Sequence, residues 1–183
     1  EEREAWSWLR EAVARFRAQL VETISRYGRP LSEKRINNIL AVLSKPLHYA
    51  ADANRFEPDR QAETVAYLLS IGADPNALNK DGVAPLHRAV RTRSLAAVHA
   101  LLDGGANPRL PNQAGSTPLH LAVQTTGRGG SGSPLAREQQ AAIVRLLLER
   151  GARVTDRDSG GKTVQQAAAS DWTRALLRDA TAG

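Results

Sequence analysis

The sequence predicts an all-α solenoid, a stack of helix-turn-helix units, because three blocks of residues recur along it in a fixed order. The blocks are a Pro-Leu-His triplet, a pair of leucines and a Gly-Ala step. They begin at Pro46, Pro85 and Pro118; at Leu68, Leu101 and Leu147; and at Gly72, Gly105 and Gly151. Self-similarity at a period of this length is the sequence signature of stacked supersecondary units.

Each unit is predicted to form two short helices. Thr117 and Pro118 suit a helix start, because the threonine oxygen can cap free backbone N–H groups and proline at the first helical position has no N–H to satisfy. A second helix places Leu101 and Leu102 on one apolar stripe, and Gly105 suits its end because glycine adopts the left-handed conformation without steric cost. One helix pair cannot bury such a stripe, whereas stacked copies can.

The three blocks resemble the ankyrin repeat, and the resemblance covers about 44–177. It implies an ankyrin solenoid with short β-hairpin-like loops and three to four repeats. The expected repeats are 44–79, 80–112, 113–158 and a degenerate C-terminal cap at 159–180, in which Val164-Gln165-Gln166 replaces Pro-Leu-His and the second helix is short. In this cap, Trp172 is expected to close the core with Leu176 and Leu177.

Residues 1–43 are expected to form an N-terminal cap of two helices. Apolar residues from Trp6 to Tyr27 fall at steps of three and four, and a second stripe follows from Ile36 to Leu43. Terminal units of a solenoid must cover the apolar end of the stack, which favours the cap interpretation. A helix that binds a partner or a membrane surface is the alternative.

Two repeats depart from the family pattern by insertions. The first has six additional residues between its helices, where Asp52–Arg60 is expected to form a connection that leads to a helix at about Gln61. The third has 13 additional residues, with a glycine-rich stretch at 127–133. This stretch lacks the lysine and hydroxyl residue that complete a P-loop, so it predicts a flexible linker, with a loop that orders on a partner as the alternative.

Composition limits the function classes. The net charge is +6, but the basic residues are scattered among acidic ones and there are only 3 Trp, 3 Tyr and 2 Phe, so neither nucleic-acid nor membrane binding is expected. The absence of cysteine excludes disulfides and thiolate metal sites. No cofactor is expected. The arginine excess suggests a bacterial source, and the cytoplasm is favoured over export.

The histidines of the Pro-Leu-His blocks, His48, His87 and His120, share one structural position without a carboxylate in the same register, so a metal site is not expected. The resemblance implies that each histidine bonds to backbone of a neighbouring turn and ties one repeat to the next. His99 lies opposite the leucines and is expected to be exposed.

We expect a non-enzymatic, monomeric module that binds another protein through its concave face, which the resemblance implies is lined by hairpin tips and first helices. A recognition or inhibitory domain of a larger enzyme or exported effector is the alternative. The expected partner-binding residues are the hairpin residues Leu78, Lys80, Asp81, Val83, Leu110, Asn112, Gln113, Ser116, Arg157, Ser159 and Lys162 and the first-helix residues Arg91, Thr92, Gln124 and Thr125.

Overall fold

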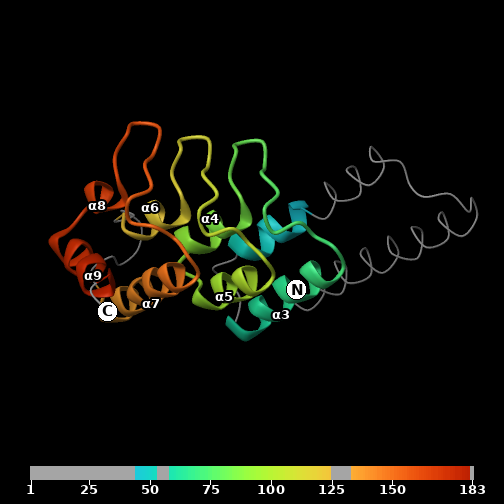
Figure 1. The fold of residues 1–183 in the computed structure, drawn as a ribbon. Helices are drawn as coiled ribbons and strands as arrows, with labels where there is room; N and C mark the ends of the chain where they lie inside the picture. Colours follow the sequence, from blue (N-terminus) through green and yellow to red (C-terminus); the bar gives the residue numbers. More distant parts are fainter. Residues whose placement is uncertain (1–43, 53–57, 125–132, 182–183) are drawn as a thin grey trace, which may run out of the picture. The chain divides into compact units, whose positions relative to one another are not determined.

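The computed structural model describes residues 44–52, 58–124 and 133–181 of the 183-residue chain. All of them belong to one compact unit, Leu40–Gly183 (Figure 1). The expected N-terminal cap at 1–43, the glycine-rich stretch up to residue 132 and Thr125 lie outside the described residues.

The described residues form two rows of helices, which confirms the all-α solenoid (Figure 1). Residues 44–52 are helical and begin the row of first helices, which continues with α4 (Pro85–Arg91), α6 (Pro118–Ala122) and α8 (Val164–Ala167). The second helices are α3 (Pro58–Ser70), α5 (Leu95–Asp103), α7 (Pro134–Glu149) and α9 (Asp171–Thr181). Successive second helices pack against one another, as do α4, α6 and α8.

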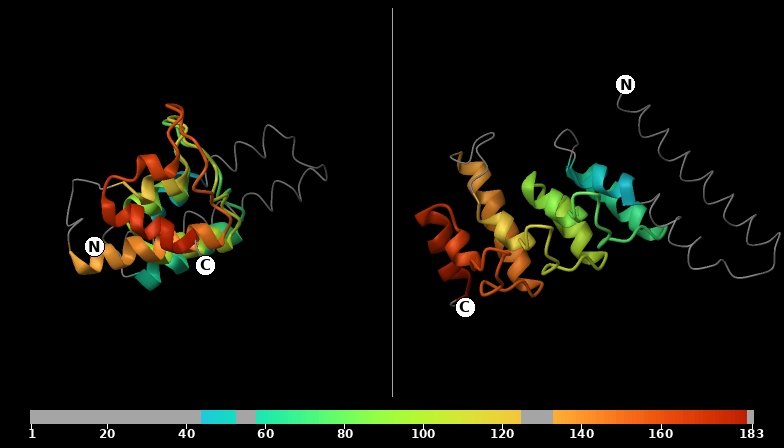
Figure 2. Two further views of the ribbon diagram at one scale, coloured as in Figure 1. Left: turned by 60° about the vertical axis from the view of Figure 1, so that its left-hand side comes forward. Right: turned by 90° about the horizontal axis from the view of Figure 1, so that it is seen from above.

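Three loops project from the same side of the helices and stand next to one another, and they overlap in the left view of Figure 2 (Figures 1 and 2). Within the described ranges, β pairing is limited to one isolated antiparallel bridge, between Arg157 and Thr163. The loops are therefore hairpin-like turns and not strands of a sheet.

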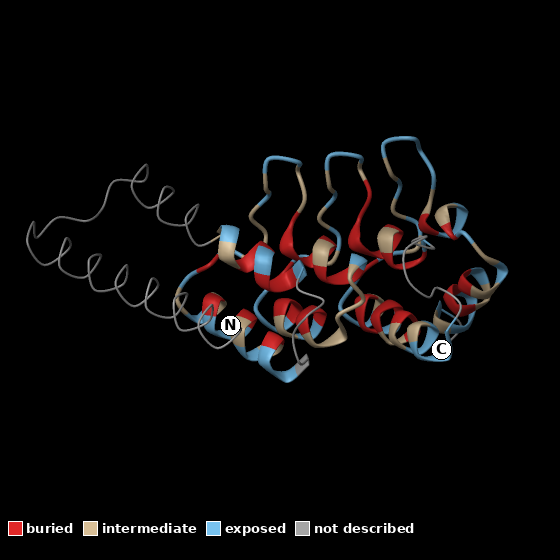
Figure 3. Cartoon of the chain, turned by 180° about the vertical axis from the view of Figure 1, so that it is seen from behind, coloured by how far each residue is buried: buried red, intermediate tan, exposed pale blue. Residues whose placement is uncertain are grey.

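The core lies between the two rows of helices, and both rows carry buried residues (Figure 3). The leucine of each Pro-Leu-His block is at most 1% exposed, and so is the first leucine of each leucine pair. Burial of one such side chain stabilises the fold by roughly 1.5–3 kcal/mol. Gly72, Gly105 and Gly151, which follow the second helices, have φ between 88° and 96°, as expected for glycines that end helices.

Two expectations about helix bounds are wrong. The connection expected at Asp52–Arg60 overlaps both neighbouring helices, because Asp52 is helical and α3 already begins at Pro58. Proline is favoured in the first turn of a helix, where its missing N–H is not needed. In the last unit the short helix is the first one, α8, with 4 residues, whereas α9 has 11.

The histidines tie neighbouring repeats together, which confirms the expectation from the family. Each of the three rings places Nε2 within hydrogen-bond distance of a carbonyl oxygen in the next repeat. The pairs are His48 with Val83 (2.8 Å), His87 with Ser116 (3.1 Å) and His120 with Lys162 (3.2 Å). In the second and third repeats Nδ1 accepts a backbone N–H of the same helix start, so the proton of the neutral ring is on Nε2.

In each repeat that carries an insertion, a buried glutamine on the second helix forms a hydrogen bond to the end of the first helix. Gln61, on α3, donates from its side-chain nitrogen to the Ala50 carbonyl at 2.7 Å, and Gln140, on α7, donates to the Ala122 carbonyl at 2.6 Å. Each glutamine lies seven residues before the first leucine of its leucine pair. Ser94 occupies this position in the central repeat, where it is the N-cap of α5.

Candidate protein-binding surface

Each of the three loops contains a tight turn that is closed by an Asn or Asp side chain. In the first, the side-chain oxygen of Asn79 accepts hydrogen bonds from the backbone N–H groups of Asp81 and Val83, both at 2.9 Å. Gly82 donates to the Asn79 carbonyl at 2.9 Å and has a φ of 65°. Asn and Asp stabilise such turns because their side chains bond to backbone that follows them.

The other two turns repeat this geometry. Asn112 accepts from Ala114 and Ser116 at 2.9 and 3.0 Å, and Asp158 accepts from Gly160 and Lys162, both at 2.9 Å. The side-chain oxygen of Asn112, an expected binding residue, is thus occupied within its own turn. Ser116, another expected binding residue, is buried, and its carbonyl accepts from the His87 ring, so it contributes to the contact between repeats.

The turns present their intervening residues to solvent. Lys80 and Asp81 are exposed at the first tip, Gln113 and Ala114 at the second, and Ser159 and Gly160 at the third. Val83 follows the first tip and is half-buried, whereas Lys162 follows the third and is exposed.

The register of the repeats shows which residue matches Leu78. This leucine is 50% exposed, and Pro111 lies 33 residues after it, the separation that also relates Gly82 to Gly115. Arg157 occupies the position in the third loop that immediately precedes the turn, as Leu78 and Pro111 do in theirs, and it donates to the Gly161 carbonyl at 2.6 Å. Pro111 is exposed, whereas Leu110 is half-buried.

Neighbouring tips are in direct contact. The backbone N–H and the hydroxyl of Ser159 both donate to the Ala114 carbonyl, at 3.1 and 2.6 Å. A Cβ on Gly115 would clash with the backbone of Ser159, and a Cβ on Gly82 would lie 2.9 Å from the Cβ of Gln113. Glycine is therefore required at both positions, for its positive φ and for the close approach.

The bases of the loops are also joined. The Asn76 side chain accepts from the Asn107 backbone N–H at 2.7 Å and donates to the Gly105 carbonyl at 3.1 Å. Arg109 binds Asp156 through Nε and Nη2 at 2.9 and 2.7 Å. The hydrogen bonds from Arg109 lower the pKa of Asp156 below its ordinary value. These bonds hold the three loops in a fixed row, so the surface is organised before a ligand arrives.

The first helices add a second group of exposed side chains. Tyr49 is 69% exposed on the helix at 44–52, and Arg91 and Gln124 are exposed at the ends of α4 and α6. Arg88 pairs with Asp52 of the preceding first helix at 2.6 Å. We call the residues at 78–83, 111–116 and 157–162, together with the exposed side chains of the first helices, the hairpin face.

Thr92 and Thr125 complete the expected set. The Thr92 hydroxyl lies 3.1 Å from the Arg88 carbonyl and 3.2 Å from the Ala89 carbonyl of its own helix, so it contributes to the end of α4. Thr125 lies outside the described residues. The role of all the expected residues in partner binding stays a prediction.

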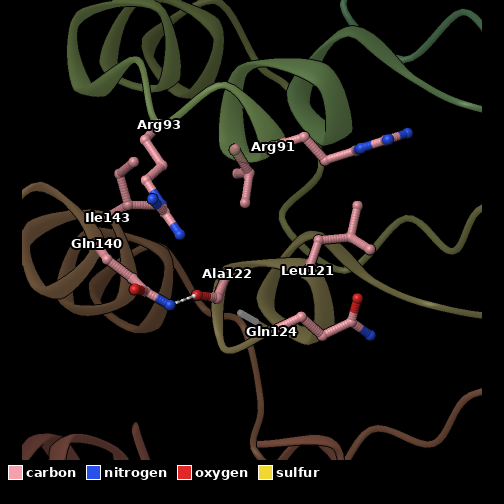
Figure 4. Close-up of a pocket in the computed structure, with 8 residues that line it drawn as sticks. Arg91, Arg93, Leu121, Ala122, Gln124, Gln140 and Ile143 are labelled. Carbon is pink, nitrogen blue, oxygen red and sulfur yellow. Dashed lines mark hydrogen bonds between the residues drawn. The ribbon is translucent and has the colours of Figure 1, made fainter. Parts of the chain in front are cut away.

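Two cavities lie among the described residues. One, of about 10 Å³, lies between α4, α6 and α7, and Figure 4 shows Gln140 bonded to Ala122 beside it while Arg91 extends away from Arg93. This volume corresponds to about one water molecule. A groove of about 730 Å³ lies between α3 and α5 and is lined mostly by small residues such as Ala66 and Ala100.

Within the parts of the chain that the structure describes, there is no group of three or more His, Cys, Asp or Glu residues that could hold a metal ion. None of the described helices is long and apolar enough to cross a membrane.

Sequence reasoning missed several residues of this surface. Asn79 and Asp158 close their turns as Asn112 does, and the signal was the spacing of Asn or Asp three residues before glycine in all three loops. Pro111 could have been found by counting the 33-residue register from Leu78. The exposure of Tyr49 had no signal in the sequence.

Comparison with known proteins agrees with this geometry. The family model for ankyrin repeats, in three copies, matches residues 47–158. Among solved structures, the chain is similar to the ankyrin repeat domain of Bcl-3, which is described as a unique member of the IkappaB protein family. The TM-score is 0.56 at 32% sequence identity, over 72% of this chain and 50% of that chain, so this chain matches about half the length of the Bcl-3 structure. The chain belongs to the ankyrin repeat family.

Proposed function

We propose that this ankyrin domain binds a protein partner through the hairpin face and performs no catalysis itself. Ankyrin repeats are generally protein-interaction modules, and the family is typically non-enzymatic. Fold does not determine function, so the proposal depends on the surface itself.

One observation carries the proposal: the residues that shape the hairpin face are repeated, whereas the residues that it exposes differ from unit to unit. The turn-closing Asn or Asp and the glycine three residues later are present in all three loops. The two residues between them are Lys-Asp, Gln-Ala and Ser-Gly. A constant framework with varied exposed side chains suits recognition of a specific partner, because the framework fixes positions at which side chains determine specificity.

The test is affinity capture from nuclease-treated lysate of the source organism with the full chain as bait. The variant carries Leu78→Ala, Arg91→Ala and Lys162→Ala, three exposed residues outside the turn-closing set. A matched control carries His99→Ala, Arg145→Ala and Glu149→Ala, which are exposed on α5 and α7. We expect the bait and the control to retain a protein that the hairpin-face variant loses.

Equal capture by both variants would contradict the hairpin face as the site. Capture of nothing by the unmodified chain would instead favour the alternative, a recognition domain that acts on a larger polypeptide of which it is part. Thermal unfolding of each variant by circular dichroism shows that a lost protein does not reflect a lost fold.

A further inference from the structure

The acidic and the basic side chains of the hairpin face differ in how many of them have partners within the molecule. Two of its acidic side chains have internal partners, as does Asp156 at the adjoining loop base: Asp52 pairs with Arg88, Asp158 accepts from backbone N–H groups of its own turn, and Asp156 pairs with Arg109. Their negative charge is therefore compensated before any ligand binds.

Three basic side chains of the same face have no such partner, whereas Arg157 donates to the Gly161 carbonyl. Lys80, Arg91 and Lys162 are exposed, and within the described residues none of their side chains forms a hydrogen bond or an ion pair. They come from the first loop, from α4 and from the third loop, so they extend across the stack. Asp81 is the exposed acid that lies beside them at the first tip.

The outer helices differ from the hairpin face in the balance of their acidic and basic side chains. On α3, α5 and α7 the charged side chains are of both signs: Asp59, Arg60, Glu63, Asp103, Arg137, Glu138, Arg145 and Glu149. These three helices therefore carry no excess of basic over acidic side chains, in contrast to the hairpin face.

Apolar anchors accompany this charge. Leu78 is 50% exposed two residues before Lys80, and Tyr49 is 69% exposed on the helix at 44–52. Tyr49 and Asp52 are three residues apart, so they share a helix face and the tyrosine lies beside the Asp52 and Arg88 pair. Exposed aromatic residues are favoured in protein interfaces because they bury a large apolar area at low entropic cost.

We propose that the occupant of the hairpin face is an acidic polypeptide segment that carries apolar side chains. This inference rests on the proposed function and adds the chemistry of the partner. Carboxylates would pair with Lys80, Arg91 and Lys162, while apolar side chains of the segment cover Leu78 and Tyr49. A nucleic acid fits less well, because its sugar-phosphate backbone has no apolar side chain that could cover the exposed Leu78.

The first experiment uses the full chain and measures fluorescence anisotropy with three labelled probes. These are a short peptide of glutamate, glycine and leucine, its counterpart with lysine in place of glutamate, and a single-stranded oligonucleotide of the same net charge as the acidic peptide. We expect binding of the acidic peptide alone, and an affinity that falls as salt is raised because exposed charges are screened. Binding of the oligonucleotide in preference to the acidic peptide, or of no probe, would overturn the proposal.

Charge reversal locates the site. Arg91→Glu combined with Lys162→Glu should weaken binding of the acidic peptide about tenfold or more, because attraction becomes repulsion at two positions. The matched control is Arg145→Glu combined with Arg137→Glu on α7, which makes the same change in net charge on an outer helix. Equal weakening by both variants would mean that net charge and not the hairpin face attracts the peptide, and would overturn the proposal.

The same variants distinguish this inference from the proposed function. If the native partner is captured through Leu78 and Tyr49 but resists both high salt and charge reversal, the hairpin face binds a protein and the acidic chemistry is wrong. If alanine replacement of the hairpin-face residues leaves capture of the native partner unchanged, the proposed function fails as well.

Discussion

In the central repeat and in the last unit, a side chain accepts the backbone N–H at the start of the first helix, but the two side chains differ. In the central repeat, the Nδ1 atom of His87 accepts the Ala84 backbone N–H at 3.2 Å, and Nε2 lies 3.1 Å from the Ser116 carbonyl of the next repeat. In the last unit, Gln166 occupies the equivalent position and its Oε1 accepts the Thr163 backbone N–H at 2.9 Å. The glutamine is exposed, whereas the histidine is 0% exposed.

This difference separates two roles that the histidine combines. Both residues satisfy a free N–H at the start of a first helix, which is a local requirement of any helix end. Only the histidine adds a bond to the following repeat, for which it uses its second nitrogen. The last unit therefore retains the local bond and not the connection between repeats.

The connections between helices show a related contrast. In the central repeat a short turn joins α4 to α5, and Arg93 adopts a φ of 57° so that the N–H groups of Arg93 and Ser94 bond to carbonyls near the end of α4. The first and third repeats have insertions here, and Gln61 and Gln140 supply the bond to the preceding helix from a side chain. A buried glutamine thus replaces a turn that the insertion removes.

The largest effect is expected from His87→Ala. The change leaves the buried Ala84 N–H without its acceptor, which costs about 1–3 kcal/mol, and it removes the bond to the Ser116 carbonyl, which keeps the Asn112 N–H as a donor. We expect a loss of about 3–5 kcal/mol in the free energy of unfolding measured with urea, once the lost ring volume is included. His99→Ala is the control, because His99 is exposed. A loss no larger than that of the control would show that the connection between repeats is not stabilising.

Gln140→Leu tests the role of the buried glutamine in the third repeat. It keeps the approximate volume but leaves the Ala122 carbonyl without its donor, so the free energy of unfolding should fall by about 1–3 kcal/mol. Gln139→Leu, at the neighbouring half-buried position of α7, should change it much less. If both variants unfold at the same urea concentration, the bond from Gln140 to Ala122 does not stabilise the connection between α6 and α7.

Acid should destabilise the central repeat through His87. Burial lowers the pKa of His87 below the ordinary histidine value of about 6.5, so the unfolded chain takes up a proton at this residue before the folded chain does. The stability that depends on neutral His87 is fully present above about pH 6.5 and is lost as the pH falls from there towards the lowered pKa. In this range the free energy of unfolding should change by up to about 1.4 kcal/mol per pH unit. Urea unfolding from pH 7.5 to pH 5 should show this slope, and it should be shallower in His87→Gln.

The smallest effect is expected from Gln166→Ala. Only the local bond to the Thr163 N–H is lost, and water can replace the exposed glutamine, so the free energy of unfolding should fall by about 0.5–1 kcal/mol. The informative comparison is between the losses in the free energy of unfolding caused by Gln166→Ala and by His87→Ala. Losses of similar size would mean that the local bond, and not the bond to the next repeat, accounts for the contribution of the histidine.

Much of the fold could be predicted, because the repeats place the same residue types at the same spacing. The histidine ties, the glycines that end the second helices and the buried leucines all follow from that register. Less of the candidate surface could be predicted. Asn112 was expected to contact a partner, yet its side-chain oxygen closes its own turn. The start of α3 at Pro58 was also missed, because the insertion that precedes it differs in length and sequence from the insertion of the third repeat.

The sequence by itself determined the repeat: its period, its helix starts and ends, and the residues that each unit must bury. These features depend on interactions within one unit, which spacing along the chain specifies directly. Only the tertiary structure decided how neighbouring units meet. The packing of Gly115 against Ser159, the pairing of Arg109 with Asp156 and the compensation of Asp52 by Arg88 join residues that are 36 to 47 positions apart. Such partners are selected by the stacking of one unit on the next, so the charge left free on the hairpin face becomes visible only when the stack is formed.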